Sequence, residues 1–517
     1  MKLVTAAEMR RLEEQAAVTG TPASELMERA GIGVARAIRA FLGGVAGKRF
    51  LVLVGPGNNG GDGLVAARHL HRWGARVHLC LLSPRPQDDR NFALTCQQGI
   101  PFTDAGPDAL PALKGLLSGA DAVVDAVLGT GRVRPLDGLF RDALLAVGSA
   151  RTARPGLAVI AVDLPSGVDA DTGDADPVTP RADLTLTLGL PKRGLYSPPG
   201  AGLAGRVEVV DIGLPPADEV PTELLDAQWA ASTLPPRPAT AHKGTFGRLL
   251  VAAGSARYVG AAYLACMGAC RVGAGLVTLA TPASLHPVLA AKLTEATHLP
   301  LPEAPPGFLC GEAVAPSVEE LPRYNALLIG CGLGQGPGPA AFVEGLLSLL
   351  GDIPSVWDAD GLNLLAALPS WPQRLPRGAV LSPHPAEMAR LSGQAVEDIQ
   401  RDRIEVTREL ARRWQKVVVL KGAYTVVASP EGRVRLSPFA NPALASAGTG
   451  DVLAGAVGGL LAHGLPPFDA AAHGVYLHRL AGELVRKEMG QAGTLASDLL
   501  PALPLTIKKL MEDAHAR

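Results

Sequence analysis

Short apolar segments alternate with amphipathic, helix-like stretches along most of this 517-residue sequence. "RFLVLVG" and "RVHLCLL" are two such segments from the first half, and "RLLVAAG" and "ALLIGCG" come from the second. Strands that are apolar throughout and separated by helices are typical of parallel sheets buried on both faces. The pattern therefore predicts an α/β fold with helices on both sides of a doubly wound sheet.

A proline-rich segment interrupts this alternation after residue 214. The stretch "PPADEVPTELLDAQWAASTLPPRPATAHKGTFG" has no sustained periodicity, and local structure is allowed only for residues 223–234. A chain of 517 residues also exceeds what one hydrophobic core usually serves, so two domains are expected. We place them at residues 1–222 and 223–517.

Composition and charge exclude several classes of protein. A formal charge of −1 provides no basic field, so neither nucleic acid nor an anionic membrane is expected as a partner. The start "MKLVTAAEMRRLEEQ" lacks the apolar core of a secretory signal, and the apolar stretch near 444–465 contains Asp451 and many glycines. The six cysteines form no C-x-x-C pair, so we expect a cytoplasmic protein in a reducing compartment.

The first glycine-rich loop satisfies G-x-G-x-x-G at Gly55, Gly57 and Gly60, the spacing found in dinucleotide-binding domains. A dehydrogenase of that type needs an acidic residue at the end of the second strand to hold the ribose. Here that strand runs into "SPRPQDD", where the first acidic residue, Asp88, comes too late. A phosphate-binding helix start and a tight turn without ligand therefore both remain open.

Polar residues also follow two later strands of the first half. Asp125 ends one apolar segment, and Asp163 ends another and is followed by Pro165 and Ser166. Each carboxylate alone could cap a turn. Since the carboxyl ends of parallel strands meet at one edge of a sheet, together they favour a ligand-binding crevice there.

Several of these loops match one known domain in order. The motifs "GPGNNGGDGLVAARHL", "VDAVLGTG", "VDLPSGVDADTG" and "LGLPKRGLYSPPG", with the leading "LMERAG", resemble the NAD(P)H-hydrate epimerase domain over residues 1 to about 222. That family interconverts the epimers of NAD(P)HX, which is NAD(P)H with water added across a double bond of the nicotinamide ring. The resemblance therefore implies a nicotinamide nucleotide as the substrate and not as the hydride carrier, with an N-terminal Rossmann-like fold.

The same resemblance implies roles for individual residues. Asn59, Asp125 and Ser166 would bind a potassium ion, and Asp163 is the candidate for proton transfer. Lys192 would either assist electrostatically or be a solvated loop lysine. The residues expected to bind NADHX or NADPHX are Asn58, Asn59, Gly60, Gly61, Asp62, Gly129, Thr130, Gly131, Arg132, Val133, Arg134, Pro135 and Asp163.

In the second half, the stretch "NPALASAGTGDVLAGAVGGLLAHG" points most strongly to chemistry. Gly448 and Gly450 at a helix start suit phosphate binding, and Asp451 among them is either an N-cap or a base beside a transferring phosphate. Upstream, "LKG" places Lys421 at a strand end, where its charge can neutralise phosphate. "SPHPAE" offers a histidine and a glutamate at metal-ligand spacing, but no third ligand is evident, so a metal site is not favoured there.

The combination of G-T-G-D with an upstream Lys-Gly resembles the ribokinase-like fold. The motifs "HKGTFGRLLVAAGS", "DADGLN", "SPHPAEMARL", "LKGAYT" and "AGTGDVLAG" are similar more narrowly to ADP-dependent NAD(P)H-hydrate dehydratase, over residues 236 to about 510. That family uses ADP, or ATP in eukaryotic relatives, to phosphorylate the hydrate, and loss of phosphate restores NAD(P)H. The resemblance implies Asp451 as the base and Mg²⁺ as a cofactor, with Asp360 and Asn363 in a supporting role on the phosphate or magnesium side.

Two further sets of binding residues follow from this second resemblance. Those expected to bind ADP are Lys421, Gly422, Ala423, Tyr424, Thr425, Asn441, Pro442, Ala443, Leu444, Ala445, Ser446, Ala447, Gly448, Thr449 and Gly450. Those expected to bind the hydrate are Ala261, Gly332, His384, Pro385, Ala386, Glu387, Met388, Ala389, Arg390 and Asp451.

The resulting hypothesis is a bifunctional repair enzyme whose epimerase domain supplies the one epimer that its dehydratase domain accepts. The alternative is a kinase for a small, vitamin-like alcohol, joined to an N-terminal nucleotide-binding sensor. In both cases the partners are small molecules, and a homo-oligomer is expected. NADHX, NADPHX and ADP are the substrates in the first case.

Overall fold

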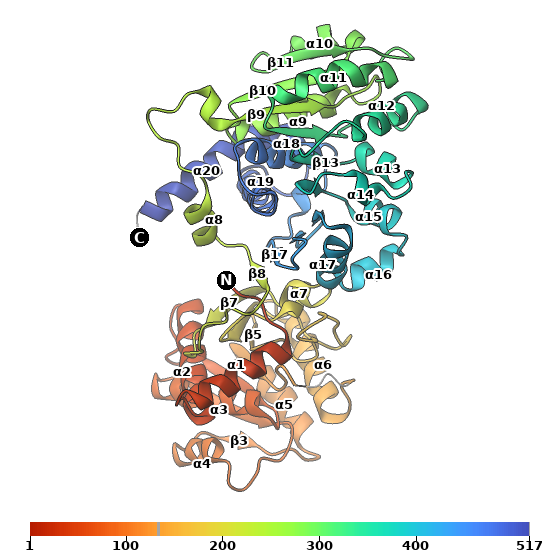
Figure 1. The fold of residues 1–517 in the computed structure, drawn as a ribbon. Helices are drawn as coiled ribbons and strands as arrows, with labels where there is room; N and C mark the ends of the chain where they lie inside the picture. Colours follow the sequence, from red (N-terminus) through yellow and green to blue (C-terminus); the bar gives the residue numbers. More distant parts are fainter. Residues whose placement is uncertain (132–134, 516–517) are drawn as a thin grey trace. The chain divides into compact units, whose positions relative to one another are not determined.

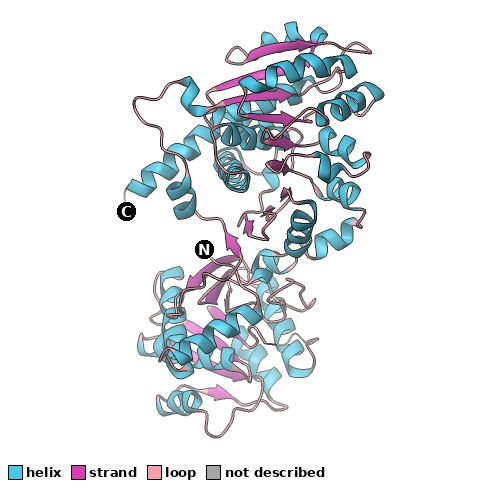
Figure 2. Ribbon diagram, in the orientation of Figure 1, coloured by secondary structure: helices cyan, strands magenta, loops and turns pink. Residues whose placement is uncertain are grey.

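The computed structural model describes residues 1–131 and 135–515 of the chain. It divides into two compact units, Met1–Val220 and Pro221–Arg517. Each unit contains its own β-sheet with helices packed around it (Figures 1 and 2). The predicted boundary at residue 222 lies two residues beyond this division.

The sheet of the first unit is parallel at every strand pair that the described residues form. Its spatial order is β3-β2-β1-β4-β5-β6-β7. From β1 the chain adds strands first on one side, to β3, and then on the other side, starting with β4. The strands are β1 (Arg49–Val54), β2 (Arg76–Leu81), β3 (Phe102–Thr103), β4 (Ala122–Ala126), β5 (Ala158–Val162), β6 (Leu184–Leu188) and β7 (Arg206–Val210). This order is that of a doubly wound Rossmann-like sheet, which confirms the predicted fold class.

The helices of the first unit present apolar faces to this sheet. In the helix that covers residues 23–41, the buried side chains recur every three or four residues, which is the expected pattern for packing on one face. The helices are α1 (Ala6–Val18), α2 (Ala23–Phe41), α3 (Asn58–Arg72), α4 (Arg90–Gln97), α5 (Ala109–Leu117), α6 (Gly138–Ala153) and α7 (Gly200–Leu203).

The reversal of strand order fixes where ligands can bind. The chain leaves β1 toward one side of the sheet and leaves β4 toward the other, so the two following loops diverge and open a crevice at the carboxyl edge. Asn58 begins α3 directly after the β1 loop, Asp125 lies at the end of β4, and Ser166 follows β5. The topology therefore brings three predicted site segments to one edge.

The second unit is built on a mixed sheet of order β11-β10-β9-β12-β13-β14-β15-β16-β17-β8. It is parallel from β11 to β15 and antiparallel at the β15–β16 and β16–β17 pairs. The strands are β8 (Thr222–Leu224), β9 (Arg248–Ala252), β10 (Leu276–Pro282), β11 (Thr297–Leu301), β12 (Ala326–Ile329), β13 (Ser355–Trp357), β14 (Ala379–Leu381), β15 (Val417–Leu420), β16 (Val426–Ala428) and β17 (Val434–Leu436).

The segment expected to be a linker contributes a strand and a helix to the second unit. β8 pairs with β17 at the sheet edge, and Thr222 and Leu224 are buried there. Trp229, in the helix that follows, stacks on His473 with ring centroids 4.3 Å apart. A three-residue strand is too short to show alternation, so its pairing partner alone defines it.

The helices of the second unit surround the sheet, and the most apolar of them lies in the core. In α18, all residues from Val452 to Ala462 are buried, and a Cβ on Gly455 would lie 2.0 Å from the carbonyl oxygen of Ala265 in α9. The helices are α8 (Ala227–Thr233), α9 (Val259–Arg271), α10 (His286–Ala290), α11 (Val314–Glu320), α12 (Pro337–Leu347), α13 (Asp360–Ala366), α14 (Trp371–Arg374), α15 (Pro385–Ser392), α16 (Val396–Arg401), α17 (Arg403–Trp414), α18 (Thr449–Ala462), α19 (Pro467–Met489) and α20 (Leu499–His515).

In the part of the chain that the structure describes, no helix combines the length and apolar character needed to cross a membrane. The strand order of the second sheet again reverses, here between β9 and β12. After β12 the backbone turns at Gly330, whose φ is 128° and where a Cβ would lie 1.8 Å from the carbonyl oxygen of Asp358. Glycine thus permits the close approach that forms this crevice, in the ribokinase-like arrangement that was predicted.

Candidate active sites of the two units

The first candidate site begins at the start of α3. The predicted phosphate loop from Asn58 to Asp62 is the first turn of this helix, with Gly57 as its N-cap. A Cβ on Gly60 would lie 2.1 Å from the carbonyl oxygen of Gly55, and one on Gly61 would lie 2.7 Å from the sulfur of Met27. These glycines therefore let the helix start pack closely, while its backbone N–H groups remain suited to an anion.

A buried ion pair lies at the end of β5. Asp163 has a left-handed backbone, with φ at 67°, and its Oδ1 accepts hydrogen bonds from Lys192 Nζ at 2.5 Å and from the backbone N–H of Leu188 at 3.1 Å. The side chain of Lys192 is only 1% exposed, so the alternative of a solvated loop lysine is wrong. Its ammonium group orients one carboxylate oxygen of Asp163.

The other carboxylate oxygen of Asp163 faces the loop after β4. A Cβ on Gly129 would lie 3.2 Å from Asp163 Oδ2 and 3.4 Å from the side-chain amide carbon of Asn59. The structure thus brings Asn59, Gly129 and Asp163 together. Gly131 and Pro135 are exposed, and Arg132, Val133 and Arg134 lie outside the described residues.

Oxygen atoms gather beside this cluster with no protein cation among the described residues to balance them. Asp125 accepts from the Ser166 hydroxyl at 2.6 Å and from the Ser166 backbone N–H at 2.8 Å. Burial raises the pKa of Asp125, although these hydrogen bonds lower it. Both polar atoms of the Asn59 amide are buried without a hydrogen-bond partner in the described structure. Such a set is incomplete without a ligand.

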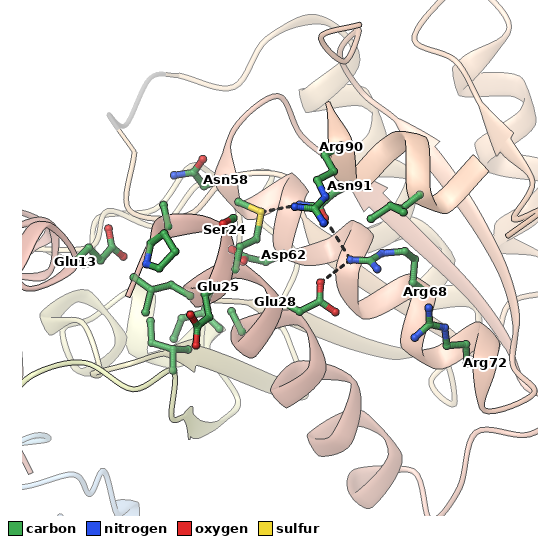
Figure 3. Close-up of a pocket in the computed structure, with 18 residues that line it drawn as sticks. Glu13, Ser24, Glu25, Glu28, Asn58, Asp62, Arg68, Arg72, Arg90 and Asn91 are labelled. Carbon is green, nitrogen blue, oxygen red and sulfur yellow. Dashed lines mark hydrogen bonds and ion pairs between the residues drawn. The ribbon is translucent and has the colours of Figure 1, made fainter. Parts of the chain in front are cut away.

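A pocket of about 750 Å³ opens next to Asp163, and Leu188, whose N–H bonds that carboxylate, lines it. Glu13 and Asn58 lie on one side of Asp62 in this pocket, and Arg68, Arg72 and Arg90 lie on the other (Figure 3). Burial raises the pKa of Asp62 well above its usual value, and the charges of Asp163 and Glu13 raise it further. Glu13 was not predicted, because a glutamate on an amphipathic helix carries no distinguishing pattern.

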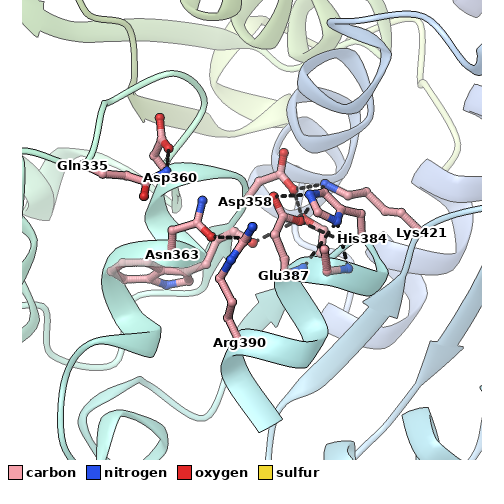
Figure 4. A network of polar contacts seen from close by, with 11 residues as sticks. Gln335, Asp358, Asp360, Asn363, His384, Glu387, Arg390 and Lys421 are labelled. Atoms are coloured by element: carbon pink, nitrogen blue, oxygen red, sulfur yellow. Dashed lines mark hydrogen bonds and ion pairs between the residues drawn. The ribbon is translucent and has the colours of Figure 1, made fainter. Parts of the chain in front are cut away.

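The second candidate site is organised around Lys421, at the end of β15. Its ammonium group pairs with Asp358 and lies 3.7 Å from Glu387 Oε2 (Figure 4). Burial lowers the pKa of Lys421, but the charges of Asp358 and Glu387 more than offset this, so that it rises to about 12. Asp358 was not predicted. It directly follows β13, so the strand-end argument used for Asp125 would have found it.

Asp451 lies in the first turn of α18, close to this ion pair. Ligand atoms of Cys331, Asp358 and Asp451 all lie within 4.8 Å of one another. Burial raises the pKa of Asp451 to about 6, and the charge of Asp358 contributes. A Cβ on Gly450 would lie 3.7 Å from Lys421 Nζ, so the two segments predicted to bind ADP meet here. A carboxyl group poised near neutral pH beside a lysine suits proton transfer.

The predicted run from His384 to Arg390 forms the start of α15. His384 is the N-cap: its Nδ1 accepts from the backbone N–H groups of residues 386 and 387, and Glu387 Oε2 accepts from the N–H of His384 at 2.7 Å. Arg390 Nη1 donates to Asn363 Oδ1 at 2.7 Å (Figure 4). Met388 is fully buried, so its side chain is not available to a ligand.

The neighbouring loops complete the crevice. Asp360 accepts from the backbone N–H of Gly334 at 2.9 Å and from Gln335 Nε2 at 2.8 Å, which fixes the loop after β12. In the same loop a Cβ on Gly332 would lie 2.9 Å from the Cβ of Ala261, so these two predicted residues do meet. The side-chain nitrogen of Asn441 is buried without a hydrogen-bond partner among the described residues.

Comparison with known proteins links both sites to one family. A family model described as NAD(P)H-hydrate dehydratase matches residues 249–505, and one described as YjeF-related protein N-terminus matches residues 23–194. The bifunctional NAD(P)H-hydrate repair enzyme of Moorella thermoacetica is 43% identical over 100% of this chain and 98% of its own length. The chain belongs to the bifunctional NAD(P)H-hydrate repair enzymes.

Two further matches, one to a full-length relative and one to a solved structure, are as follows. The repair enzyme of Thermofilum pendens is 37% identical over 99% of this chain and 97% of its own length. A solved structure of the ADP/ATP-dependent NAD(P)H-hydrate dehydratase from Bacillus subtilis, co-crystallised with ATP and Mg²⁺, is 34% identical. It covers 56% of this chain and 98% of its own chain, with a TM-score of 0.48.

The buried pair in the first unit of this repair enzyme predicts a large effect on stability. Lys192→Met leaves the carboxylate of Asp163 buried without its cation, which lowers the free energy of unfolding by about 3–5 kcal/mol. Calorimetry of the full chain, following the transition of the first unit, measures this change. Arg206→Met is the control, because its ion pair with Glu208 is exposed and contributes about 1 kcal/mol at most.

If Lys192→Met unfolds at the same temperature as this control, the ion pair does not hold the site together. The double variant with Asp163→Asn should recover much of the loss, because no charge is then left unpaired in the interior.

Proposed function

We propose that this chain repairs NAD(P)HX in two steps. The first unit interconverts the R and S epimers, and the second unit converts the S epimer to NAD(P)H at the expense of ADP. In the second step ADP transfers its terminal phosphoryl group to the ring hydroxyl and AMP leaves. The ring then loses phosphate and a proton, which restores the double bond. The substrates are therefore NADHX or NADPHX, together with ADP.

The observation that carries this proposal is the position of Asp451. Its carboxyl group, with a pKa of about 6, lies at the amino end of α18, where Gly450 adjoins Lys421. A helix start and a lysine suit the phosphates of ADP, and a carboxylate there can accept the proton of the attacking hydroxyl. We assign Asp451 as the base, the two loops that meet at Gly450 to ADP, and the crevice at Ala261, Gly332 and His384 to the hydrate.

For the first unit we propose that Asp163 moves the proton during epimerisation. Its free oxygen faces Gly129 and Asn59, and Lys192 together with the N–H of Leu188 holds the other oxygen in place. The 750 Å³ pocket that starts at Asn58 and Asp62 would hold the nucleotide. Its size suits a substrate that is enclosed over part of its surface.

Potassium fits the oxygen cluster of the first unit. Asn59 offers an unpartnered buried carbonyl oxygen, and Asp125 is a buried carboxylate with no positively charged partner among the described residues. We propose that Asn59, Asp125 and Ser166 hold the ion, which would balance the carboxylate and fix the loops around the ring. For the second unit, Cys331 is a poor magnesium ligand, so we propose that Mg²⁺ enters with the phosphates of the nucleotide.

We also propose a cytoplasmic location, because all six cysteines are free thiols in the structure, as suits a reducing compartment. The homo-oligomer expected from the sequence stays a prediction.

Mixed R and S NADHX, supplied with ADP, separates the two activities. The unaltered chain should convert both epimers to NADH. Asp163→Asn keeps the shape of the side chain but removes the proton acceptor, so the R epimer should be consumed roughly 100 to 10,000 times more slowly. Conversion of the S epimer should be unchanged. Absorbance of NADH and chromatography of the epimers measure both rates, after the spontaneous epimerisation rate is subtracted.

The alternative function, a kinase for a small alcohol, is tested by replacing NADHX with candidate alcohols and measuring phosphate release. A chain that releases phosphate or forms a phosphoester with such an alcohol, but leaves NADHX intact, would contradict the repair function.

If the first unit binds potassium, the choice of salt should affect epimerisation but not dehydration. Replacing potassium by lithium at constant ionic strength should slow epimerisation, because lithium is too small to bridge oxygen ligands that are positioned for a larger ion. Dehydration of purified S epimer should proceed at the same rate in both salts. Equal epimerisation rates in lithium and in potassium would contradict the proposal that the first site binds potassium.

The raised pKa of Asp451 predicts the pH dependence of dehydration. The base must be deprotonated, so kcat should rise about tenfold per pH unit below pH 6 and level off above it, near the pKa of about 6. Asp451→Asn should reduce kcat by about a hundredfold or more and remove this rise, while ADP binding stays nearly unchanged. Loss of ADP binding by a folded Asp451→Asn variant would instead make this residue a structural cap.

A further inference from the structure

Two arginines, Arg479 buried and Arg403 half-buried, support the Lys421–Thr425 segment, and neither was predicted from the sequence. Arg403, the first residue of α17, donates from Nη2 to the carbonyl oxygens of Leu420 at 3.0 Å and Lys421 at 3.1 Å. Arg479, in α19, donates to the carbonyl oxygen of Gly422 and to Thr425 Oγ1, the latter at 2.8 Å. Lys421, Gly422 and Thr425 of the segment thus each accept a hydrogen bond from a guanidinium group.

The segment packs directly on one of these groups. Gly422 has a left-handed backbone with φ at 137°, and a Cβ there would lie 3.1 Å from Arg403 Nη2. A side chain there would be strained by this backbone conformation, and the guanidinium would have to shift by a few tenths of an ångström. The glycine of the Lys-Gly motif is therefore explained by this contact as well as by the turn.

The charge of Glu483 partly compensates Arg479 and raises its pKa, but neither arginine is paired directly with an acid in the described residues. Their hydrogen-bond acceptors are backbone carbonyl groups, a hydroxyl and the amide of Gln400, and within the described residues neither makes an ion pair with a carboxylate. Arg403 Nε is buried without a hydrogen-bond partner in the part of the chain that the structure describes. Burial lowers the pKa of both side chains to about 10, and the charge of Arg479 also lowers that of Arg403. Two like charges placed together in the interior are unfavourable without an anion.

The lysine of the same segment cannot supply that balance. Lys421 is already paired with Asp358 and lies close to Glu387, so its charge is balanced within the protein. The positive charge beside the segment that no ion pair balances therefore comes from the two arginines. In addition, His478, next to Arg479 on α19, contacts the carbonyl oxygen of Thr449 at 2.9 Å, so this helix touches both segments assigned to ADP.

We propose that Arg403 and Arg479 are positioning residues for the nucleotide: they fix the Lys421–Thr425 backbone and hold the phosphates of ADP through their paired positive charge. This inference rests on the proposed ADP site of the second unit. The two arginines would recognise the diphosphate of ADP more than its adenosine. They act through the loop and do not contact the reacting atoms.

The test compares nucleotides that differ in phosphate charge. Arg403→Met and Arg479→Met keep much of the buried side-chain volume but remove the charge. Titration calorimetry should show ADP binding weakened by on the order of tenfold in each variant, with a smaller loss for AMP. Arg408→Met is the control: it lies on the same helix as Arg403 and is as buried as Arg479, but it is paired with Glu405, so both affinities should stay as in the unaltered chain.

Arg403→Lys and Arg479→Lys separate charge from scaffolding. Lysine keeps the charge without the planar group, so the preference for ADP over AMP should persist even where the loop is less well held. An equal loss for ADP and AMP in the methionine variants, or the same loss in the control, would overturn the electrostatic role. If the unaltered chain binds no ADP, the proposed function of this site fails as well, whereas normal ADP binding in every variant overturns this inference alone.

Discussion

In each unit of this enzyme a buried lysine is paired with an aspartate that directly follows a strand. Lys192 binds Asp163 after β5, and Lys421 binds Asp358 after β13. Moving such charges out of water is expensive, and only close pairing with further hydrogen bonds compensates for it. The pairs can persist because the carboxyl edge of a parallel sheet collects polar strand ends where the strand order reverses. The other candidate site residues lie around these two ion pairs.

The two pairs leave different carboxyl groups available. In the first unit the lysine binds the candidate proton carrier itself, so one oxygen of Asp163 is fixed and the other faces Asn59. In the second unit the lysine binds the neighbouring Asp358, and among the described residues Asp451 forms no direct ion pair, although the charge of Lys421 lowers its pKa. Burial and the nearby charge of Asp358 then raise its pKa to about 6. The first arrangement orients an acceptor, and the second makes an acceptor responsive to pH near neutrality.

Much of the architecture could be predicted because buried parallel strands are apolar along their whole length and end at glycine or aspartate. β1 is followed by Gly55, and β5 is followed by Asp163; the loops after them stay predictions as ligand-binding segments. The short edge strand β8 could not be found, because three residues show no periodicity and only β17 makes them a strand. The segment containing it resembled a linker for the same reason.

Site residues escaped prediction where a contact joins distant parts of the chain. Glu13 reaches the first pocket from α1, and Arg479 lies more than fifty residues beyond the loop that it supports. Neither belongs to a short motif, since an arginine on a long helix or a glutamate among other glutamates is common on protein surfaces. What distinguishes them is burial next to groups of the site, which only the folded chain reveals.

The same reasoning explains why the second site tolerates so much buried charge. Lys421, Asp358 and Glu387 balance one another within the fold, whereas Arg403 and Arg479 form no ion pair among the described residues, and Glu483 offsets part of the charge of Arg479. Because the arginines would gain an anionic partner only when a ligand binds, part of the electrostatic stabilisation of this site would be realised on ligand binding. In the ADP site proposed above, phosphate entering at the start of α18 would meet a field already oriented toward it, so little reorganisation would be needed before the phosphoryl group is transferred.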